Sequence, residues 1–89
     1  MSAYREHTQA LAKGVDPNAV MAELYGRKDG ASGGKGGSMH IFDKSVGFVG
    51  GHGIVGAQIP LGAGLAFAEK YNETGNVSIC YFGDGATRQ

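Results

Sequence analysis

The sequence predicts an α/β fold in which helices flank a parallel sheet, and three features of its second half lead to this prediction. An apolar helix is expected over residues 54–71, a β-prone run follows at residues 77–82, and Gly-Asp-Gly at residues 83–85 ends the run sharply. A helix, a turn, a strand and a glycine turn in this order are typical of α/β folds with a parallel sheet. With 89 residues, the chain is one small domain at most or a piece of a larger one.

The first element that the sequence predicts clearly is a short helix over residues 17–25. The preceding residues 1–14 are polar and mixed, and fit the end of a helix or a loop. Asp16 can cap a helix whose first position is Pro17, because proline already has the backbone angle that this position requires. Apolar residues then recur at helical spacing, and Gly26 stands where a C-terminal cap glycine belongs.

Glycine is the outlier of the composition, and ten of the 17 glycines lie in residues 26–53. Within this segment, residues 32–38 have the composition of a flexible linker, whereas the part after them is too apolar for a solvated tether. A loop of this length without regular structure is usually functional or disordered. Its glycines therefore mark either disorder or a close approach of the backbone to a ligand.

The helix expected over residues 54–71 is apolar enough to be buried. Gly56, Gly62 and Gly64 give it a face without side chains, which lets another backbone approach at a cost of about 1 kcal/mol per glycine in helix propensity. A polar turn and a strand of buried length are expected next, over residues 72–76 and 77–82.

Charge and composition exclude several classes of function. The 8 basic and 8 acidic residues balance, so no field draws the chain to nucleic acid or to an anionic membrane. The single cysteine, Cys80, excludes an internal disulfide framework and fits a reducing compartment. The sequence has no apolar run of membrane-spanning length, no signal-peptide pattern, no zinc-ligand spacing and no Walker A loop.

The turn after the expected strand is the first candidate site. Ligands of open α/β sheets bind beyond the carboxyl ends of strands, and Asp84 stands there between Gly83 and Gly85. Its carboxylate suits Mg²⁺, and the glycines leave amides free to meet phosphate oxygens. Taken alone, this tripeptide is more often an ordinary turn, because Asp-Gly is a common turn pair.

Three further segments carry candidate residues. Glycine-rich residues 50–58 lead into a helix N-terminus, where main-chain groups can bind a phosphate or a heterocycle. His40 can carry a proton or bind an anion, and Arg5 beside Tyr4 offers the planar fork that suits phosphate. Each segment also has a plain alternative: a loop that needs glycine to turn, a surface or packed histidine, and a solvated arginine. Spacing alone favours function only for residues 50–58.

The order and spacing of these segments are far more specific than any one of them. Together they closely resemble the α subunit of thiamine-diphosphate-dependent 2-oxo acid dehydrogenases of the pyruvate dehydrogenase type, over essentially the whole chain. The matching segments are Tyr4 with Arg5, residues 23–27 (ELYGR), residues 34–40 (GKGGSMH), residues 53–64 (GIVGAQIPLGAG) and residues 83–86 (GDGA).

The resemblance implies thiamine diphosphate and Mg²⁺ as cofactors, and residues 1–89 as an incomplete, diphosphate-side part of a thiamine-diphosphate-binding domain. It places Tyr4 and Arg5 near the diphosphate, the main-chain groups of Gly53 and Val55 at the aminopyrimidine ring, and His40 in a loop near the active site. The opening of the diphosphate motif, with Asp84 as metal ligand, matches Gly83, Asp84, Gly85 and Ala86. In the family this motif closes further along the chain with an asparagine, and Arg88 stands where asparagine is more usual.

The resemblance also implies an activity and its partners. Pyruvate is decarboxylated on thiamine diphosphate, and the acetyl unit passes to a lipoyl group of the dihydrolipoyl acyltransferase core. A β subunit, in a heterotetramer of two α and two β chains, supplies the glutamate that activates the cofactor. The compartment implied is the cytoplasm in a bacterium and the mitochondrial matrix in a eukaryote.

Three alternatives remain beside this one. Acetoin and branched-chain 2-oxo acids are used by related α subunits, although residues 53–56 (GIVG) fit the pyruvate and acetoin types better than the branched-chain type. A second alternative is a generic phosphate-binding α/β module without a thiamine cofactor. A third alternative is a noncatalytic fragment that is inactive and folds poorly by itself, as expected at this size.

Overall fold

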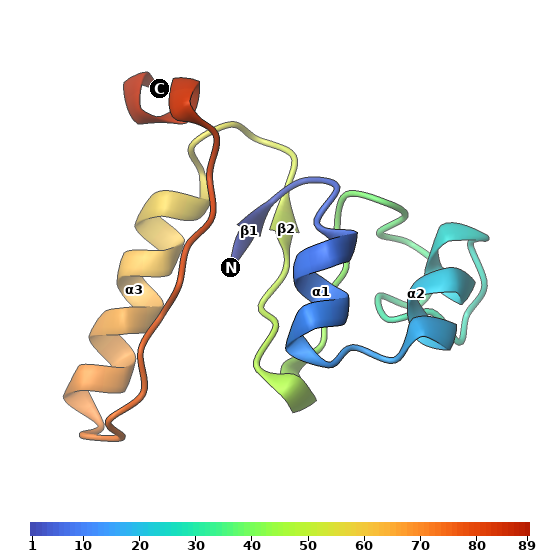
Figure 1. The fold of residues 1–89 in the computed structure, drawn as a ribbon, viewed down its shortest axis with the longest axis horizontal. Coiled ribbons are helices and arrows are strands. Elements are labelled where there is room, and N and C mark those ends of the chain that lie inside the picture. Colours follow the sequence, from blue (N-terminus) through green and yellow to red (C-terminus); the bar gives the residue numbers. More distant parts are fainter.

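The computed structural model describes all 89 residues, and Figure 1 shows a short central sheet with helices on either side. Helices α1 and α2 lie on one side of the sheet, and α3 lies on the other with the segment that follows it. The elements in chain order are β1 (Ser2–Ala3), α1 (His7–Lys13), α2 (Pro17–Leu24), the 3₁₀ turn η1 (Lys44–Val46), β2 (Gly51–His52), α3 (Gln58–Tyr71) and the 3₁₀ turn η2 (Asp84–Arg88).

Strands β1 and β2 pair in parallel, with Ser2 opposite Gly51 and Ala3 opposite His52. Parallel strands with helices on both sides agree with an α/β fragment, as the sequence predicts. Each strand has only two residues. The sheet is therefore a small patch of the kind of architecture that was expected.

The segment at residues 77–82 does not form the regular strand that its composition predicts, and this expectation is wrong for the chain as it stands. The segment is extended and runs beside α3 (Figure 1). Its main-chain pairing is with Met1, whose nitrogen donates to the Ile79 carbonyl at 3.2 Å and whose carbonyl accepts from the Tyr81 N–H at 3.0 Å. This pair of bonds is a single parallel bridge, and a ladder needs several paired residues on a neighbouring strand.

The bridge to Met1 fixes where the segment lies. Successive residues of a strand direct their main-chain groups to opposite sides, and the N–H of Ser2 donates to Gly50 on the β2 side at 3.1 Å. Residues 77–82 therefore flank β1 on the side opposite β2 and run in the same direction as both strands. Three parallel segments result, with β1 in the middle.

Helix α2 ends within one residue of its predicted boundary, because its end signals are local. The Asp16 side chain accepts a hydrogen bond from the N–H of Asn18 at 3.0 Å, and Pro17 begins the helix. Gly26 has a φ of +66°, the left-handed conformation of a residue just beyond a helix C-terminus.

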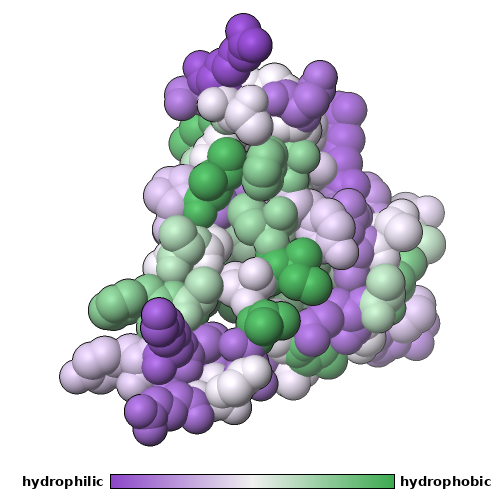
Figure 2. Space-filling model, turned by 60° about the vertical axis from the view of Figure 1, so that its left-hand side comes forward, coloured by the Kyte–Doolittle hydropathy of each residue, from purple (hydrophilic) through white to green (hydrophobic).

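Helix α3 begins at Gln58, four residues later than expected, and it is mostly exposed. Only Gln58 and Gly62 are buried, so the prediction of a buried helix is wrong here. The reason is that a single extended segment, residues 77–82, runs beside the helix, which leaves Leu61, Phe67 and Tyr71 exposed. Phe67 and Tyr71 are 68% and 78% exposed and stack on each other. Figure 2 shows apolar side chains gathered on the side of the molecule that carries α3. None of the helices is both long and apolar enough to cross a membrane.

The glycine face of α3 explains how the extended segment approaches the helix. A Cβ added at Gly62 would lie 2.9 Å from the Cβ of Cys80, whereas one added at Gly64 would have no neighbour within 4 Å. The Cys80 thiol also donates to the Gln58 carbonyl at 3.2 Å, and Gln58 Nε2 donates to the Tyr81 carbonyl at 3.3 Å. The predicted close approach is confirmed at Gly62 and is not used at Gly64.

This pair of glycines gives a matched test of the contact. We expect Gly62→Ala to lower the free energy of unfolding by about 1–3 kcal/mol through overpacking. Gly64→Ala adds the same methyl group without a clash and is expected to raise it by up to about 1 kcal/mol through helix propensity. Thermal unfolding followed by circular dichroism measures both variants, and an equal loss of stability in both would contradict the specific contact at Gly62.

The apolar core is small and lies between α1, α2 and the loop that contains η1. Its five residues are Ala10, Val15, Val20, Ile41 and Phe48. Two carboxylates beside this core, those of Glu6 and Glu23, are completely buried. A buried carboxylate is unfavourable without hydrogen-bond partners, so these two side chains point to tightly organised backbone around them.

Candidate functional site

Three of the segments singled out in the sequence lie at one edge of the sheet. Tyr4 and Arg5 follow β1, residues 53–57 follow β2, and residues 83–86 follow the extended segment that is bonded to Met1. Because the three segments run in parallel, their carboxyl ends meet at the same edge, where α/β folds bind ligands. In Figure 1 this edge is at the top, with the turn after β1, the loop before α3 and η2.

Two of these segments approach each other closely at Gly56. This residue has a φ of +85°, and a Cβ placed there would lie 3.2 Å from the Ala86 carbonyl oxygen and 3.1 Å from the Gln89 Cβ. Ala86 itself is buried. The absence of a side chain at Gly56 therefore lets the turn at residues 83–86 lie against the loop that precedes α3.

The loop before α3 keeps main-chain groups available. No hydrogen bond within the chain uses the main-chain N–H or C=O of Gly53 or Val55. Both residues are exposed. Free donors and acceptors of this kind can recognise the edge of a heterocycle, the role that the family resemblance implies for these two positions.

Asp84 opens the η2 turn and is exposed. Its main-chain oxygen accepts from the Thr87 hydroxyl at 2.9 Å, and open space surrounds the neighbouring Gly83 and Gly85. The chain contains no group of three or more His, Cys, Asp or Glu side chains able to hold a metal ion. A single accessible carboxylate fits Mg²⁺, which takes one or two carboxylates and completes its shell with phosphate oxygens and water.

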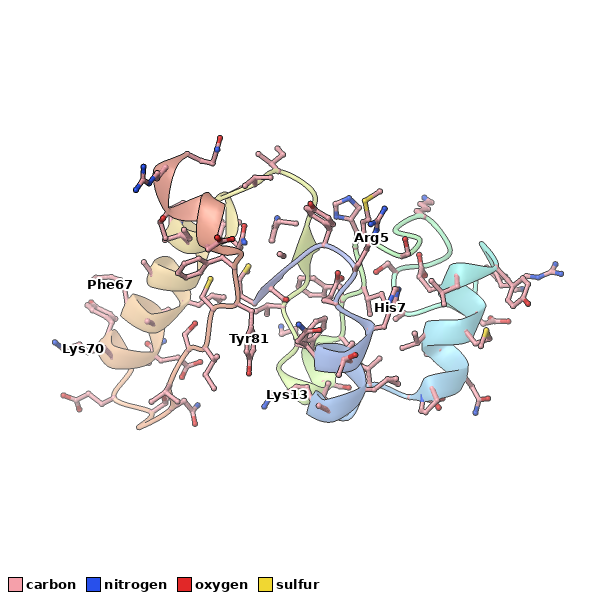
Figure 3. The ribbon with its side chains drawn as sticks, turned by 45° about the horizontal axis from the view of Figure 1, so that its top comes forward. Arg5, His7, Lys13, Phe67, Lys70 and Tyr81 are labelled. Carbon is pink, nitrogen blue, oxygen red and sulfur yellow. The ribbon has the colours of Figure 1, made fainter.

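Arg5 combines a cationic side chain with an unusual backbone. Its φ is +59°, in the left-handed region, which costs a residue with a long side chain about 1 kcal/mol or more. The guanidinium carbon lies 5.9 Å from the centre of the Tyr4 ring. Figure 3 shows Arg5 projecting from the turn after β1, away from α3. Strain of this kind clusters at functional positions.

His40 lies beside β2, and its hydrogen bond defines its proton-bearing nitrogen. Nδ1 is 3.0 Å from the Gly51 carbonyl oxygen, which can only accept, so Nδ1 carries the proton. In this tautomer, the lone pair of Nε2 has no hydrogen-bond partner within the chain. A Cβ placed at Gly53 would lie 3.6 Å from Nε2, so this nitrogen faces the loop before α3.

The structure thus places some of the predicted residues close together and others only at the same edge. The His40 ring lies beside Gly53, and the turn containing Ala86 lies close to Gly56. Tyr4, Arg5 and Asp84 share the edge of the sheet with them. Three short segments that are far apart in the sequence therefore converge.

Sequence reasoning missed the two buried carboxylates that organise this region. Glu23 accepts four hydrogen bonds from amides of residues 32–37, so these residues are anchored, and the comparison of their composition with a flexible linker does not hold. Glu6 Oε1 accepts from the N–H of Ile41 at 2.9 Å, and its buried Oε2 has no partner. The available signal was an acidic residue in a helix just before a run of glycine amides.

The charge state of Glu23 follows from its partners. Burial alone would raise the pKa of this carboxyl group. The amide bonds, beginning with that of Gly34, outweigh burial and hold the pKa of Glu23 below its usual value. The side chain is therefore a carboxylate at neutral pH.

Comparison with known proteins defines the family. The model of the dehydrogenase E1 component family matches residues 1–89. The chain belongs to the dehydrogenase E1 component family. This match confirms the resemblance that the order of the sequence motifs indicated, and E1 dehydrogenases in general use thiamine diphosphate.

Relatives of this E1 chain are named as α subunits of pyruvate dehydrogenase. The pyruvate dehydrogenase E1 component subunit alpha of Zymomonas mobilis is 61% identical over all 89 residues, and that of Rickettsia bellii is 56% identical. The mitochondrial subunit of Dictyostelium discoideum is 57% identical over the same length. The chain covers 25%, 27% and 23% of these three proteins, so it spans about a quarter of the length of the curated relatives it matches.

Proposed function

We propose that this E1 chain forms the diphosphate side of the cofactor site of a pyruvate dehydrogenase. The observation that carries the proposal is the convergence of three separate motif segments at the carboxyl edge of one parallel sheet. When bound there, thiamine diphosphate supplies the carbanion-stabilising ring for decarboxylation of pyruvate and transfer of an acetyl unit to a lipoyl group. The names of the relatives support this substrate and reaction.

The residues of the η2 turn hold the metal and the diphosphate in this proposal. Asp84 gives one oxygen ligand to Mg²⁺, and the open backbone at Gly83, Gly85 and Ala86 lets phosphate oxygens approach. A bare carboxylate in this position would be poorly placed beside a diphosphate unless a cation lay between them. The Mg²⁺ ion therefore belongs to the proposal as much as the cofactor does.

The other edge segments orient the cofactor. Arg5, with Tyr4 beside it, binds the diphosphate through its planar fork of N–H donors. The free main-chain groups of Gly53 and Val55 bind the aminopyrimidine ring. His40, whose Nδ1–H donates to the Gly51 carbonyl, presents Nε2 toward the same loop, where it takes up or gives up a proton during the reaction.

The proposal includes a β subunit that completes the site. At the edge of the sheet, Asp84 is given to the metal and Glu6 turns inward to the N–H of Ile41. No carboxylate of these edge segments is left to activate the aminopyrimidine ring. We propose that a β chain supplies the activating carboxylate, in a heterotetramer of two α and two β chains. The acetyl acceptor is the lipoyl group of a dihydrolipoyl acyltransferase core.

The compartment proposed follows the type of organism. It is the cytoplasm in a bacterium and the mitochondrial matrix in a eukaryote. The Dictyostelium discoideum relative is named as mitochondrial, whereas the bacterial relatives carry no such label.

Substrate turnover tests the proposed activity. The full-length α subunit that contains this segment is assembled with its β subunit, and reduction of an artificial electron acceptor is followed with pyruvate, acetoin or 3-methyl-2-oxobutanoate. We expect pyruvate to give the highest kcat/KM. Failure to turn over pyruvate, with activity on acetoin or on the branched-chain acid, would contradict the proposed substrate.

The 89 residues alone are proposed to fold poorly, and therefore to bind the cofactor weakly and to be inactive. Only 13 residues are buried, and the apolar face of α3 is open. Circular dichroism and a thiamine diphosphate titration of the isolated segment check this point. Tight, Mg²⁺-dependent binding by the segment alone would overturn it.

A further inference from the structure

The carboxylate of Glu23 is the most heavily hydrogen-bonded side chain of the molecule. It belongs to the last turn of α2 and is completely buried. Oε2 accepts from the N–H groups of Ser32 and Gly34, each at 2.8 Å. Oε1 accepts from the N–H groups of Gly36 at 2.6 Å and Gly37 at 3.0 Å. Two carboxylate oxygens offer about four acceptor positions, so the group is saturated by one loop.

The four amides have no other acceptor. The main-chain bonds of this loop use the alternate N–H groups, with Gly33 donating to Gly30 at 3.0 Å and Lys35 to Ser32 at 3.3 Å. The N–H groups of Ser32, Gly34, Gly36 and Gly37 turn toward Glu23 instead. Without the carboxylate, four N–H groups would lose their partners together, so the conformation of residues 30–37 depends on this one side chain.

The glycines of the loop are required by this close wrapping. A Cβ at Gly30 would overlap the side chain and backbone of Glu23, and a Cβ at Gly34 would meet the backbone of Gly26 and Arg27. Gly33 and Gly34 also have φ values of +65° and +76°, which other residues rarely adopt. These glycines therefore serve the contact with Glu23, whereas those at residues 53 and 56 serve the edge of the sheet.

Contacts lead from this loop to His40. The Ser32 hydroxyl donates to the His40 carbonyl, and a Cβ at Gly36 would overlap that same carbonyl. Immediately after His40, the N–H of Ile41 donates to buried Glu6. The backbone of His40 is therefore fixed on both sides, and its ring is directed to the Gly51 carbonyl.

We infer that Glu23 is a positioning residue, which folds the loop at residues 30–37 around its carboxylate and thereby orients His40 toward the loop before α3. The effect on catalysis rests on the proposed function. The effect on the loop does not, because it follows from the hydrogen bonds alone. The sequence motif that begins at Glu23, residues 23–27, does not reveal this role, because the role depends on the path of the following loop.

The test uses the full-length α subunit assembled with its β subunit. Glu23→Gln keeps the shape of the side chain, but its NH₂ group is a donor that would face two amide donors. Hydrogen–deuterium exchange of peptides covering residues 30–41 is expected to be at least about tenfold faster in this variant. Glu73→Gln removes an exposed glutamate from the turn after α3 and is the matched control, with exchange unchanged.

Kinetics separates positioning from a general structural role. In Glu23→Gln we expect kcat to fall by about tenfold or more, with the KM for pyruvate and the thiamine diphosphate affinity changed less than about threefold. Glu23→Asp keeps the charge on a shorter side chain, and its kcat is expected to lie between those of Glu23→Gln and the unaltered protein. Ser32→Ala removes the hydroxyl bonded to the His40 carbonyl, and we expect it to lower kcat by about threefold or more while the loop stays protected.

Each outcome bears on a different step. Unchanged exchange in Glu23→Gln would overturn the anchoring of the loop. Faster exchange with an unchanged kcat would overturn the orientation of His40, as would an unaffected kcat in Ser32→Ala if Glu23→Gln does not assemble. An unaltered enzyme that fails to use pyruvate would contradict the proposed function, whereas the exchange measurement would still decide the role of Glu23.

Discussion

Asp84→Asn is expected to weaken the binding of thiamine diphosphate to the assembled α and β subunits by more than about 100-fold. Removal of an outer hydrogen-bond partner of a metal ligand typically costs 10–100-fold, and loss of the ligand itself costs more. Asparagine keeps the size of the side chain and removes the negative charge that Mg²⁺ prefers. Isothermal titration calorimetry in the presence of excess Mg²⁺ measures the change.

Metal removal gives the companion result. Chelation of Mg²⁺ with EDTA is expected to reduce the affinity of the unaltered protein to that of Asp84→Asn, and to change the variant little, because both treatments remove the same bridge to the diphosphate. Asp29→Asn, at an exposed aspartate in the turn after α2, is the control and should bind normally. Equal, Mg²⁺-dependent affinity in Asp84→Asn and the unaltered protein would exclude Asp84 as the metal ligand.

Arg5→Asn is expected to separate stability from binding. Asparagine adopts the left-handed conformation more easily than arginine, so the free energy of unfolding should stay the same or rise by up to about 1 kcal/mol. The charge-assisted bonds to the diphosphate are lost, and a cost of about 1.5–3 kcal/mol corresponds to roughly 10–150-fold weaker cofactor binding. Thermal unfolding of the apo protein and titration of the cofactor measure the two effects.

The matched control keeps the charge and the strain at this position. Arg5→Lys retains a cation without the planar fork, and we expect an affinity between those of arginine and asparagine with no gain in stability. A loss of stability in Arg5→Asn together with normal cofactor binding would show that the strained turn has only a structural role.

Local signals explain which parts of the fold were predictable. The ends of α2 follow from Asp16, Pro17 and Gly26, which act within a few residues of the helix. The segment at residues 77–82 has the composition of a strand, but a regular strand also needs a neighbouring strand to pair with. Here only Met1 pairs with it. The burial of α3 likewise depends on what packs against it, which helical periodicity does not report.

The candidate site was predictable where it follows the rules of parallel sheets. The predicted strand end, followed by glycines and a carboxylate, placed Asp84 at the carboxyl edge of the sheet, and the structure brings Arg5 and the loop at residues 53–56 to the same edge. The role of Glu23 was not predictable in this way. Composition alone gives residues 32–37 the character of a linker, and only the folded path shows their amides converging on one carboxylate.

A crystal structure of the assembled α and β subunits with thiamine diphosphate and Mg²⁺ tests the shared cofactor edge most directly. The proposal predicts an Asp84 carboxylate oxygen about 2.0–2.1 Å from Mg²⁺ and the Arg5 guanidinium within hydrogen-bonding distance of the diphosphate. It also predicts that main-chain groups of Gly53 and Val55 contact the aminopyrimidine ring. A cofactor bound away from these three segments, or an Mg²⁺ ion held without Asp84, would contradict it.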